Sequence, residues 1–180
     1  MELENVFVCD DAEILPPGIF GGLYLTSAHG PLLFSATFLG IMQAAYTYTL
    51  DYLTGGAPGA PLKGQIGPAI GSNVSEMLCR LEAARALYYR SISEAKLQPT
   101  HEIRQRARAA HLTIQRAVVE VAQEAIRVCG GRALLKKHPL ERFLRDAQAA
   151  SVMRPWTREI ATQATWESAI EYSRKKNNMQ

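Results

Sequence analysis

Apolar side chains recur at intervals of three and four residues along most of the chain from residue 31 onward, which places them on one face of an α-helix. This spacing predicts five helices, over residues 31–53, 72–95, 100–129, 139–151 and 155–172. Gly-Gly pairs follow the first and third of these stretches, and glycine commonly ends a helix. Long helices joined by short connections predict an all-α, antiparallel up-and-down helical bundle.

The beginning of the chain has a different pattern. Residues 5–9, Asn-Val-Phe-Val-Cys, are of the types found in a short β-strand, and turn residues follow at Pro16-Pro17-Gly18. A lone strand has no partner of its own. We therefore expect residues 1–25 to be an orphan strand and linker from a β-domain, and residues 26–180 to form the helical domain. The Gly- and Pro-rich stretch 55–71 is expected to be an ordered loop.

Finer expectations concern helix ends and faces. Ser72 suits the N-cap of the second helix, and Pro155 suits the start of the last one. The residues of the last helix expected to face the core are Ile160, Ala164 and Ala169. The third helix is expected to expose to solvent the basic residues Arg104, Arg106 and Arg108.

Composition narrows the class of protein. A chain of 180 residues, 47% hydrophobic and 21% charged, suits one compact domain. The 20 basic and 17 acidic residues are interspersed, which argues against a nucleic-acid partner. The three cysteines form no C-x-x-C pair, so we expect no metal site and mostly buried, free thiols. No apolar stretch is long enough to span a bilayer and the first residues are acidic, so a cytoplasmic protein is expected.

Four segments, in order, resemble the C-terminal part of the acyl-CoA dehydrogenase family. Residues 5–8 resemble the last strand of its β-domain, and residues 39–45, Leu-Gly-Ile-Met-Gln-Ala-Ala, resemble the first helix of its C-terminal domain. Cys129-Gly130-Gly131 followed by residues 138–147, His-Pro-Leu-Glu-Arg-Phe-Leu-Arg-Asp-Ala, resembles the family's Gly-Gly turn and Pro-x-Glu-Arg-x-x-Arg-Asp-Ala run. Residues 157–160, Thr-Arg-Glu-Ile, resemble the family's Thr-Ser-Glu-Ile.

The resemblance implies a helical domain from an FAD-dependent oxidoreductase that acts on CH–CH groups of acyl thioesters. It extends over the last third of a family member, so the other domains are expected on a longer chain or on a partner chain. The apolar stripes on several helices are wide and alanine-rich, and missing domains would leave apolar surface uncovered, so a homo-oligomer, a dimer or a tetramer, is expected. Some flavin monooxygenases share this architecture, so the resemblance leaves the reaction open.

The family's catalytic glutamate has no counterpart in this chain. One family position for it falls at Pro155, beside Arg154, and the other falls at Gly30, beside His29. Neither a proline nor a glycine side chain can accept a proton. His29 is the one nearby group that could act as a base, and a loop-capping histidine is the alternative interpretation.

The flavin contacts implied by the resemblance are partly retained. The Gly130-Gly131 turn could approach a phosphate, although glycine there also suits a helix end. Thr157 and Glu159 fall on the family's Thr-x-Glu. The family's Arg-x-x-Phe-Gly loop, which a neighbouring subunit supplies, is replaced by residues 61–68, where Lys63 is the candidate for the phosphate contact.

Other conspicuous residues have structural explanations. Glu141 and Arg145 are spaced to form an ion pair within one helix, and Asp146 could hold an arginine between helices. Trp156 and Trp166 suit core or interface anchors. Two functions remain open: a part of a flavin-dependent oxidoreductase that is inactive on its own, which explains the ordered segments, and a non-catalytic oligomerisation module, which explains the missing glutamate.

Overall fold

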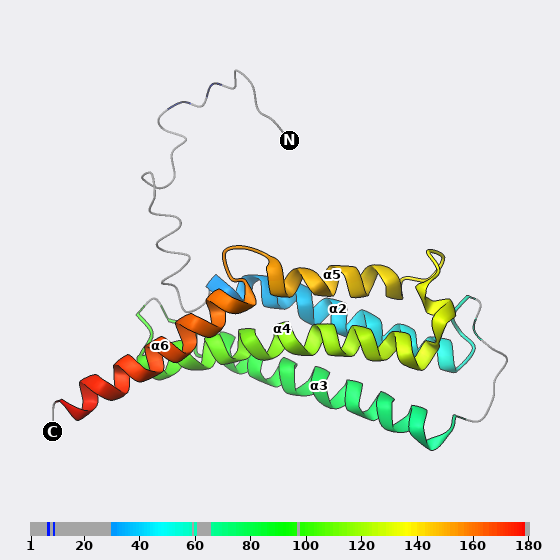
Figure 1. Cartoon of the computed structure of the whole chain (residues 1–180), viewed down its shortest axis with the longest axis horizontal. Helices are drawn as coiled ribbons and strands as arrows, with labels where there is room; N and C mark the ends of the chain where they lie inside the picture. The colour runs from blue at the N-terminus through cyan, green and yellow to red at the C-terminus, as the bar shows by residue number, and fades with distance from the viewer. Residues whose placement is uncertain are drawn as a thin grey trace.

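The computed structural model describes residues 7, 9, 30–58, 60, 66–96 and 98–178, and these form a helical bundle (Figure 1). The helices are α2 (Gly30–Leu53), α3 (Pro68–Ser93), α4 (His101–Cys129), the 3-10 helix η2 (Gly131–Leu134), α5 (Leu140–Val152) and α6 (Arg158–Asn177). The described residues contain no strand, and the all-α prediction is confirmed. The strand predicted over residues 5–9 lies mostly outside the described residues, of which Phe7 and Cys9 belong to no regular element.

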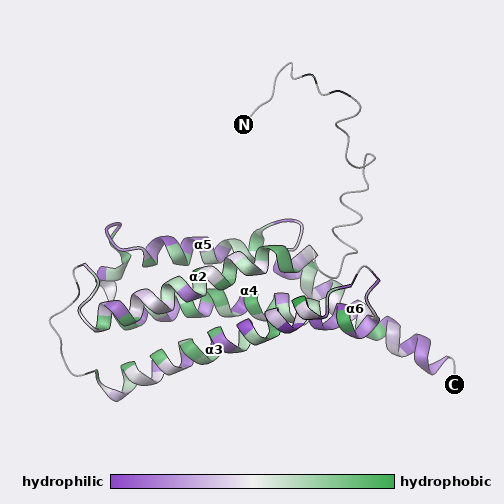
Figure 2. Cartoon of the chain, turned by 180° about the vertical axis from the view of Figure 1, so that it is seen from behind, coloured by the Kyte–Doolittle hydropathy of each residue, from purple (hydrophilic) through white to green (hydrophobic). Residues whose placement is uncertain are grey.

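Successive helices from α2 to α5 run antiparallel, and α4 contacts every other described helix. It packs against α2, α3, α5, α6 and η2, while α2 also contacts α3 and α5 (Figure 1). The last helix, α6, crosses one end of the bundle, and its C-terminal half extends past it into a hydrophilic tip (Figures 1 and 2).

Small residues allow α4 to occupy this central position. Alanine carries no more than a methyl group, so neighbouring helix axes can approach closely where it repeats. The buried apolar residues of α4 are Ile103, Ala107, Ala110, Ile114, Ala117, Val118, Val121, Ala122, Ala125 and Cys129. Larger side chains from the neighbours fill the spaces between them, chiefly Met42 of α2, Met77 and Leu81 of α3, and Leu140 of α5.

Two predicted helix starts are wrong. Helix α3 begins at Pro68 with Gly67 as its N-cap, so Ser72 lies inside the helix. Proline suits the first turn because the missing N–H has no helical partner there. Helix α6 begins after Thr157, whose hydroxyl accepts a hydrogen bond from the Ile160 N–H, and Pro155 lies in the preceding turn.

The buried face of α6 also differs from the prediction. Ala161 is its one buried residue, whereas Ile160 is 39% exposed and Ala169 is exposed. The side turned to α4 carries Tyr172, which stacks on His101 with ring centroids 3.9 Å apart. The helix also continues to Asn177 rather than ending at Tyr172 as predicted.

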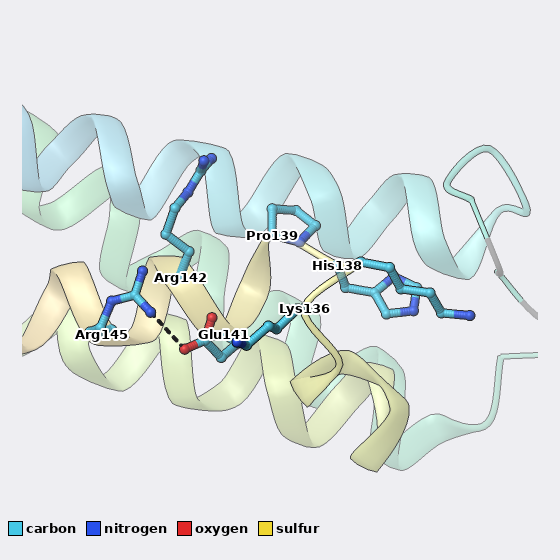
Figure 3. Close-up of a pocket in the computed structure, with 7 residues that line it drawn as sticks. Lys136, His138, Pro139, Glu141, Arg142 and Arg145 are labelled. Carbon is cyan, nitrogen blue, oxygen red and sulfur yellow. Dashed lines mark hydrogen bonds and ion pairs between the residues drawn. The ribbon is translucent and has the colours of Figure 1, made fainter.

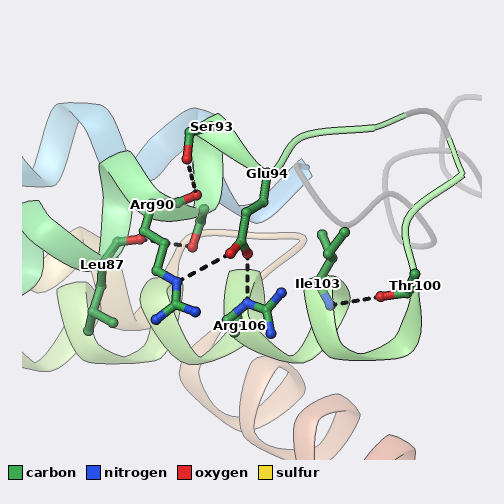
Figure 4. Close-up of polar contacts among 8 residues, drawn as sticks. Leu87, Arg90, Ser93, Glu94, Thr100, Ile103 and Arg106 are labelled. Carbon is green, nitrogen blue, oxygen red and sulfur yellow. Dashed lines mark hydrogen bonds and ion pairs between the residues drawn. The ribbon is translucent and has the colours of Figure 1, made fainter.

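The basic side chains of α4 at positions 104, 106 and 108 were predicted to be freely solvated, but two of them make contacts with neighbouring helices. Arg106 lies 2.6 Å from Glu94, which also pairs with Arg90 at 3.2 Å and so ties the end of α3 to α4 (Figure 4). The hydrogen bond from Arg106 is the main cause that holds the pKa of Glu94 below its usual value. Arg108 donates to the Ala164 carbonyl at 2.8 Å because α6 crosses this part of α4.

A buried polar cluster lies where α2, α4 and the turn before α6 meet. The Ser35 hydroxyl lies 3.0 Å from Nδ1 of His111, and the Gln115 amide donates to the backbone carbonyls of Ala150 and Trp156. The Trp156 ring stands edge-on to His111, with ring centroids 6.5 Å apart. Burial lowers the pKa of His111 to about 4, so this imidazole is neutral near pH 7.

The helix that precedes the Gly-Gly pair ends at a glycine with unusual backbone angles. Gly130 has φ 80° and ψ 177°, and its N–H donates to the Ile126 carbonyl at 2.8 Å. Side-chain-bearing residues rarely adopt these angles, so the conformation favours glycine. Gly131 has no such requirement, and a Cβ atom there would meet nothing within 4 Å.

All three thiols are free, but only Cys129 is buried, so the expectation of mostly buried thiols is wrong for Cys9 and Cys79. Within the described ranges, no group of His, Cys, Asp or Glu side chains could hold a metal ion. None of the helices described is long and apolar enough to cross a membrane.

We predict that His111 makes the chain less stable as the pH falls from about 6.5 to about 4. In that range the unfolded chain binds a proton at His111 and the folded chain does not, so protonation favours unfolding, by up to roughly 3 kcal/mol. Urea unfolding at a series of pH values measures this loss. His111→Gln should flatten it, whereas His101→Gln, at the partly exposed start of the same helix, should not. An unchanged profile in His111→Gln would assign the loss to another group.

We also predict that the two adjacent glycines respond differently to alanine. Gly130→Ala should lower the free energy of unfolding by about 1–3 kcal/mol because of its backbone angles. Gly131→Ala should change it by less than about 0.5 kcal/mol, since a methyl group there meets open space. Chemical denaturation compares the two, and equal losses would show that the backbone angles of Gly130 are not what requires glycine.

Candidate functional site

The two positions at which the resemblance places the family's catalytic glutamate lie at one end of the bundle. Gly30 is the first residue of α2 and is buried, and Pro155 lies in the turn between α5 and α6. Neither position carries a carboxylate. His29, the candidate base, lies outside the described residues, as does Lys63.

The Gly130-Gly131 turn lies at the opposite end, between α4 and η2. The Ala133 N–H donates to the Gly130 carbonyl at 2.9 Å, which continues the chain into the 3-10 turn. The helix end therefore explains why residue 130 is a glycine. At residue 131 no atom lies within 4 Å of where a Cβ atom would be, so local packing does not require glycine there. The open space beside Gly131 leaves its backbone accessible to a ligand.

A shallow, basic depression of about 510 Å³ lies beyond this turn, at the start of α5 (Figure 3). It is lined by Lys136, Lys137, His138, Pro139, Glu141, Arg142 and Arg145. Glu141 neutralises Arg145, with which it forms an ion pair at 2.8 Å. Pro139 caps α5 without a side-chain hydrogen bond, so the first N–H groups of this helix add to the positive potential.

A buried histidine fixes the loop that carries the two lysines. Nδ1 of His138 lies 2.8 Å from the Tyr48 hydroxyl, and the imidazole meets the Tyr52 ring edge-on. The His138 N–H donates to the Leu135 carbonyl at 2.8 Å. The floor of the depression is therefore preorganised, while the lysine side chains at its rim are exposed.

The thiol at this end is not reactive. Burial raises the pKa of Cys129 to about 11, and a hydrogen bond involving Thr49 offsets part of this rise. The thiolate is the nucleophilic form of cysteine, so Cys129 stays an inert thiol near neutral pH. Burial likewise raises the pKa of the neighbouring Tyr48. These groups suit a structural role.

Thr157 and Glu159 lie at the start of α6. Thr157 is the N-cap, and Glu159 occupies the first turn. Hydrogen bonds from its own backbone N–H and from the Thr157 hydroxyl are the main causes that lower the pKa of Glu159. An open depression of about 530 Å³ adjoins them, lined by Arg116, Arg158, Glu159, Thr162, Gln163 and Trp166.

The structure does not bring the candidate flavin residues together. Helix α5 separates the Gly130-Gly131 turn from Thr157, and its 13 residues span about 20 Å. The two groups of residues therefore face different ends of the bundle. In one chain they form two separate surfaces rather than one site.

Some of the other residues singled out in the sequence have the predicted contacts, and others do not. Glu141 and Arg145 form the predicted ion pair, but Asp146 holds no arginine between helices and lies 4.0 Å from the adjacent Arg145. Trp156 is buried, as expected of a core anchor, whereas Trp166 is 55% exposed. Sequence reasoning missed the contribution of Arg116 to the second depression, because its position beside α6 depends on how the two helices cross.

The sequence of helices α2 to α5 matches a known protein family. A family model described as "Acyl-CoA dehydrogenase, C-terminal domain" matches residues 32–154. An acyl-CoA dehydrogenase of Bacillus subtilis is 29% identical over 160 residues, which cover 81% of this chain and 39% of that protein. The bovine mitochondrial short-chain specific acyl-CoA dehydrogenase is 32% identical over 117 residues, covering 63% of this chain and 27% of that protein. This chain thus spans less than half the length of these relatives.

Structure comparison agrees on the fold. A nitroalkane oxidase from Podospora anserina superposes with a TM-score of 0.70 at 21% identity, covering 83% of this chain and 35% of that one. An acyl-CoA dehydrogenase from Slackia heliotrinireducens gives 0.68 at 20% identity, covering 87% and 40%. KijD3 in complex with FMN gives 0.70 at 23% identity, covering 83% and 38%. The match of the family model to more than half of the residues settles the classification: the chain belongs to the acyl-CoA dehydrogenase C-terminal domain family.

Proposed function

We propose that this chain is the helical, flavin-contacting part of an acyl-CoA dehydrogenase-like oxidoreductase that acts on CH–CH groups of acyl thioesters. The observation that carries the proposal is the family match over residues 32–154, which includes the Gly130-Gly131 turn. FAD is the cofactor by resemblance, and it would accept the hydride from the acyl chain. Gly131, with open space beside its backbone, suits an approach by a phosphate group.

Two copies of the chain are proposed to contribute to each flavin. The basic side chains beyond the Gly-Gly turn would attract the nucleotide phosphates at one end of one copy. Thr157 and Glu159 would contact a flavin at the other end of a second copy, because about 20 Å separates these groups within one chain. A homo-oligomer, dimer or tetramer, follows from this arrangement.

The chain alone is proposed to lack turnover. A base must lie within hydrogen-bond reach of the proton that it removes, and neither Gly30 nor Pro155 offers an acceptor side chain. Glu159 lies four residues after Pro155, but its pKa is lowered and its side chain forms part of the start of α6. The remaining domains, on a longer chain or on a partner chain, would supply the rest of the acyl and flavin pocket.

The missing base favours a second candidate, a non-catalytic oligomerisation module. The exposed apolar residues Trp166 and Ile170 lie one turn apart on α6. A flavin monooxygenase-type reaction is a further alternative within the flavoprotein class. FAD binding that depends on Lys63 and Gly131 would favour the flavoenzyme alternatives over the module.

We predict that the purified chain is colourless and binds added FAD weakly or not at all. The segment 61–68 lacks the aromatic and guanidinium contacts of the family, and losing two charge-assisted contacts costs roughly 3 kcal/mol, or about a hundredfold in affinity. Quenching of flavin fluorescence measures the binding. Lys63→Ala and Gly131→Ala should each weaken any binding that remains, whereas Gly40→Ala, also in open space but on α2, should not.

Two results would change the proposal. A yellow preparation with stoichiometric FAD would contradict weak binding and indicate a complete flavoprotein site. Binding of FAD that is insensitive to Lys63→Ala and Gly131→Ala would remove these residues from the site and favour the oligomerisation module.

We further predict a self-associating chain. Sedimentation at tens of micromolar should give a mass of two or four times 19.9 kDa. Trp166→Glu should shift the distribution toward monomer because it places a charge on the exposed apolar side of α6, and Trp166→Phe should not. A monomer at these concentrations would contradict the prediction.

A further inference from the structure

Helix α3 lies along one edge of the bundle (Figure 1). It contacts α2 and α4 and no other described helix, so one of its long sides is left without a neighbour in the described part of the chain. Three large apolar side chains of α3 are exposed there: Leu78 by 39%, Ile92 by 42% and Tyr89 by 63%. Single exposed apolar residues are common on protein surfaces, so the question is whether these three form one surface.

The three side chains belong to one row of residues along α3. The members of this row are spaced alternately three and four residues apart, which is the spacing of side chains that meet a neighbouring helix in a coiled coil. The row consists of Ser75, Leu78, Glu82, Arg85, Tyr89 and Ile92. Arg85 is partly buried and the other five are exposed.

An acid and a base occupy the middle of this row. Glu82 and Arg85 form an ion pair within α3, and Arg85 also donates to the side-chain carbonyl oxygen of Gln43 on α2. These contacts hold the guanidinium in place, while the Glu82 side chain remains 53% exposed. The row therefore has apolar residues toward both ends and a pair of opposite charges between them.

A second copy of the row is complementary to the first when the two helices run antiparallel. In a two-fold pairing each contact occurs twice, with the two partners exchanged. Leu78 would then meet the partner's Tyr89, and Glu82 would meet the partner's Arg85. Ser75, which is small, would leave room for the partner's Ile92. Apolar side chains would thus face each other, and opposite charges would attract.

Other alignments of the two helices lose this match. Parallel pairing in register sets Glu82 against Glu82 and Arg85 against Arg85, and like charges in contact are unfavourable. An antiparallel pairing shifted by one heptad sets Leu78 against the partner's Glu82. We propose that α3 pairs antiparallel with α3 of a second copy of this chain, through the row from Ser75 to Ile92.

The pairing has a consequence for the two candidate flavin surfaces. Antiparallel pairing turns the second bundle end for end, because α3 runs along the length of the bundle (Figure 1). The Gly130-Gly131 turn of one copy would then lie toward the same end of the dimer as Thr157 of the other. This consequence rests on the proposed function, whereas the pairing itself does not.

Sedimentation of charge-exchanged variants tests the register. Glu82→Arg sets arginine against arginine at two places in the dimer, so it should raise the Kd of the dimer at least about tenfold, and Arg85→Glu should do the same with carboxylates. The double variant E82R/R85E exchanges the two charges and should restore the Kd toward that of the unmodified chain. Arg127→Glu is the matched control, because it breaks an exposed ion pair with Glu124 on α4, and it should leave the Kd unchanged.

Disulfide cross-linking tests the direction of the two helices, in a background where Cys9 and Cys79 are replaced by serine. The double variant L78C/Y89C should form a covalent dimer on oxidation, since these positions face each other between the copies. Within one helix they lie about 16 Å apart, which is too far for an internal disulfide. Leu78→Cys alone and Tyr89→Cys alone should give no covalent dimer.

The outcomes separate this proposal from the proposed function. A covalent dimer of either single cysteine variant would overturn the antiparallel register. A dimer whose Kd does not respond to Glu82→Arg would also overturn it, and the proposed homo-oligomer would then use another surface. A monomeric chain would overturn both the pairing and the homo-oligomer. FAD binding is measured separately, so its loss would count against the proposed function and not against the pairing.

Discussion

The structure depends on one constraint, which is that α4 must be covered on nearly all sides. Its buried residues range from Ile103 to Cys129, and every other described helix contacts it. A helix enclosed in this way needs small side chains so that its neighbours can approach, and alanines at 107, 110, 117, 122 and 125 meet that need. The large side chains come from the surrounding helices, so the order of residues in α4 sets how closely the bundle packs.

Polar side chains define the ends of this bundle rather than its middle. At one end Tyr48 and His138 hold the loop that leads into α5, and at the other Ser35, His111 and Gln115 hold the turn that leads into α6. Hydrogen bonds are directional, so they fix positions that apolar packing alone leaves adjustable. The residues that resemble flavin contacts therefore lie on turns whose geometry is set by buried side chains behind them.

Under the proposed function, the separation of the two ends means that one copy of the bundle would hold only part of a flavin site. The accessible Gly-Gly turn and the basic side chains beyond it lie about 20 Å from Thr157. Two surfaces on opposite ends of the bundle suit the proposed assembly, in which one end of one copy meets the other end of a second copy. In that proposal the bundle would position the cofactor and the proton acceptor would come from a different segment, which fits the absence of a carboxylate at Gly30 and Pro155.

The helical class, the five helices and the family could all be predicted from the amino-acid sequence. The three-four spacing of apolar residues and the Gly-Gly helix ends are local signals, and residues such as Gly130 and Glu141 had the roles that their neighbours along the chain implied. Local signals failed where several residue types suited one position: Ser72 and Pro155 were plausible helix starts, but Pro68 and Thr157 served instead. Tertiary structure alone decided the pairing of Arg106 with Glu94, the burial of His111 and the separation of the two candidate flavin surfaces. These features depend on which helices cross and where, and a one-dimensional pattern of apolar positions does not record the crossing.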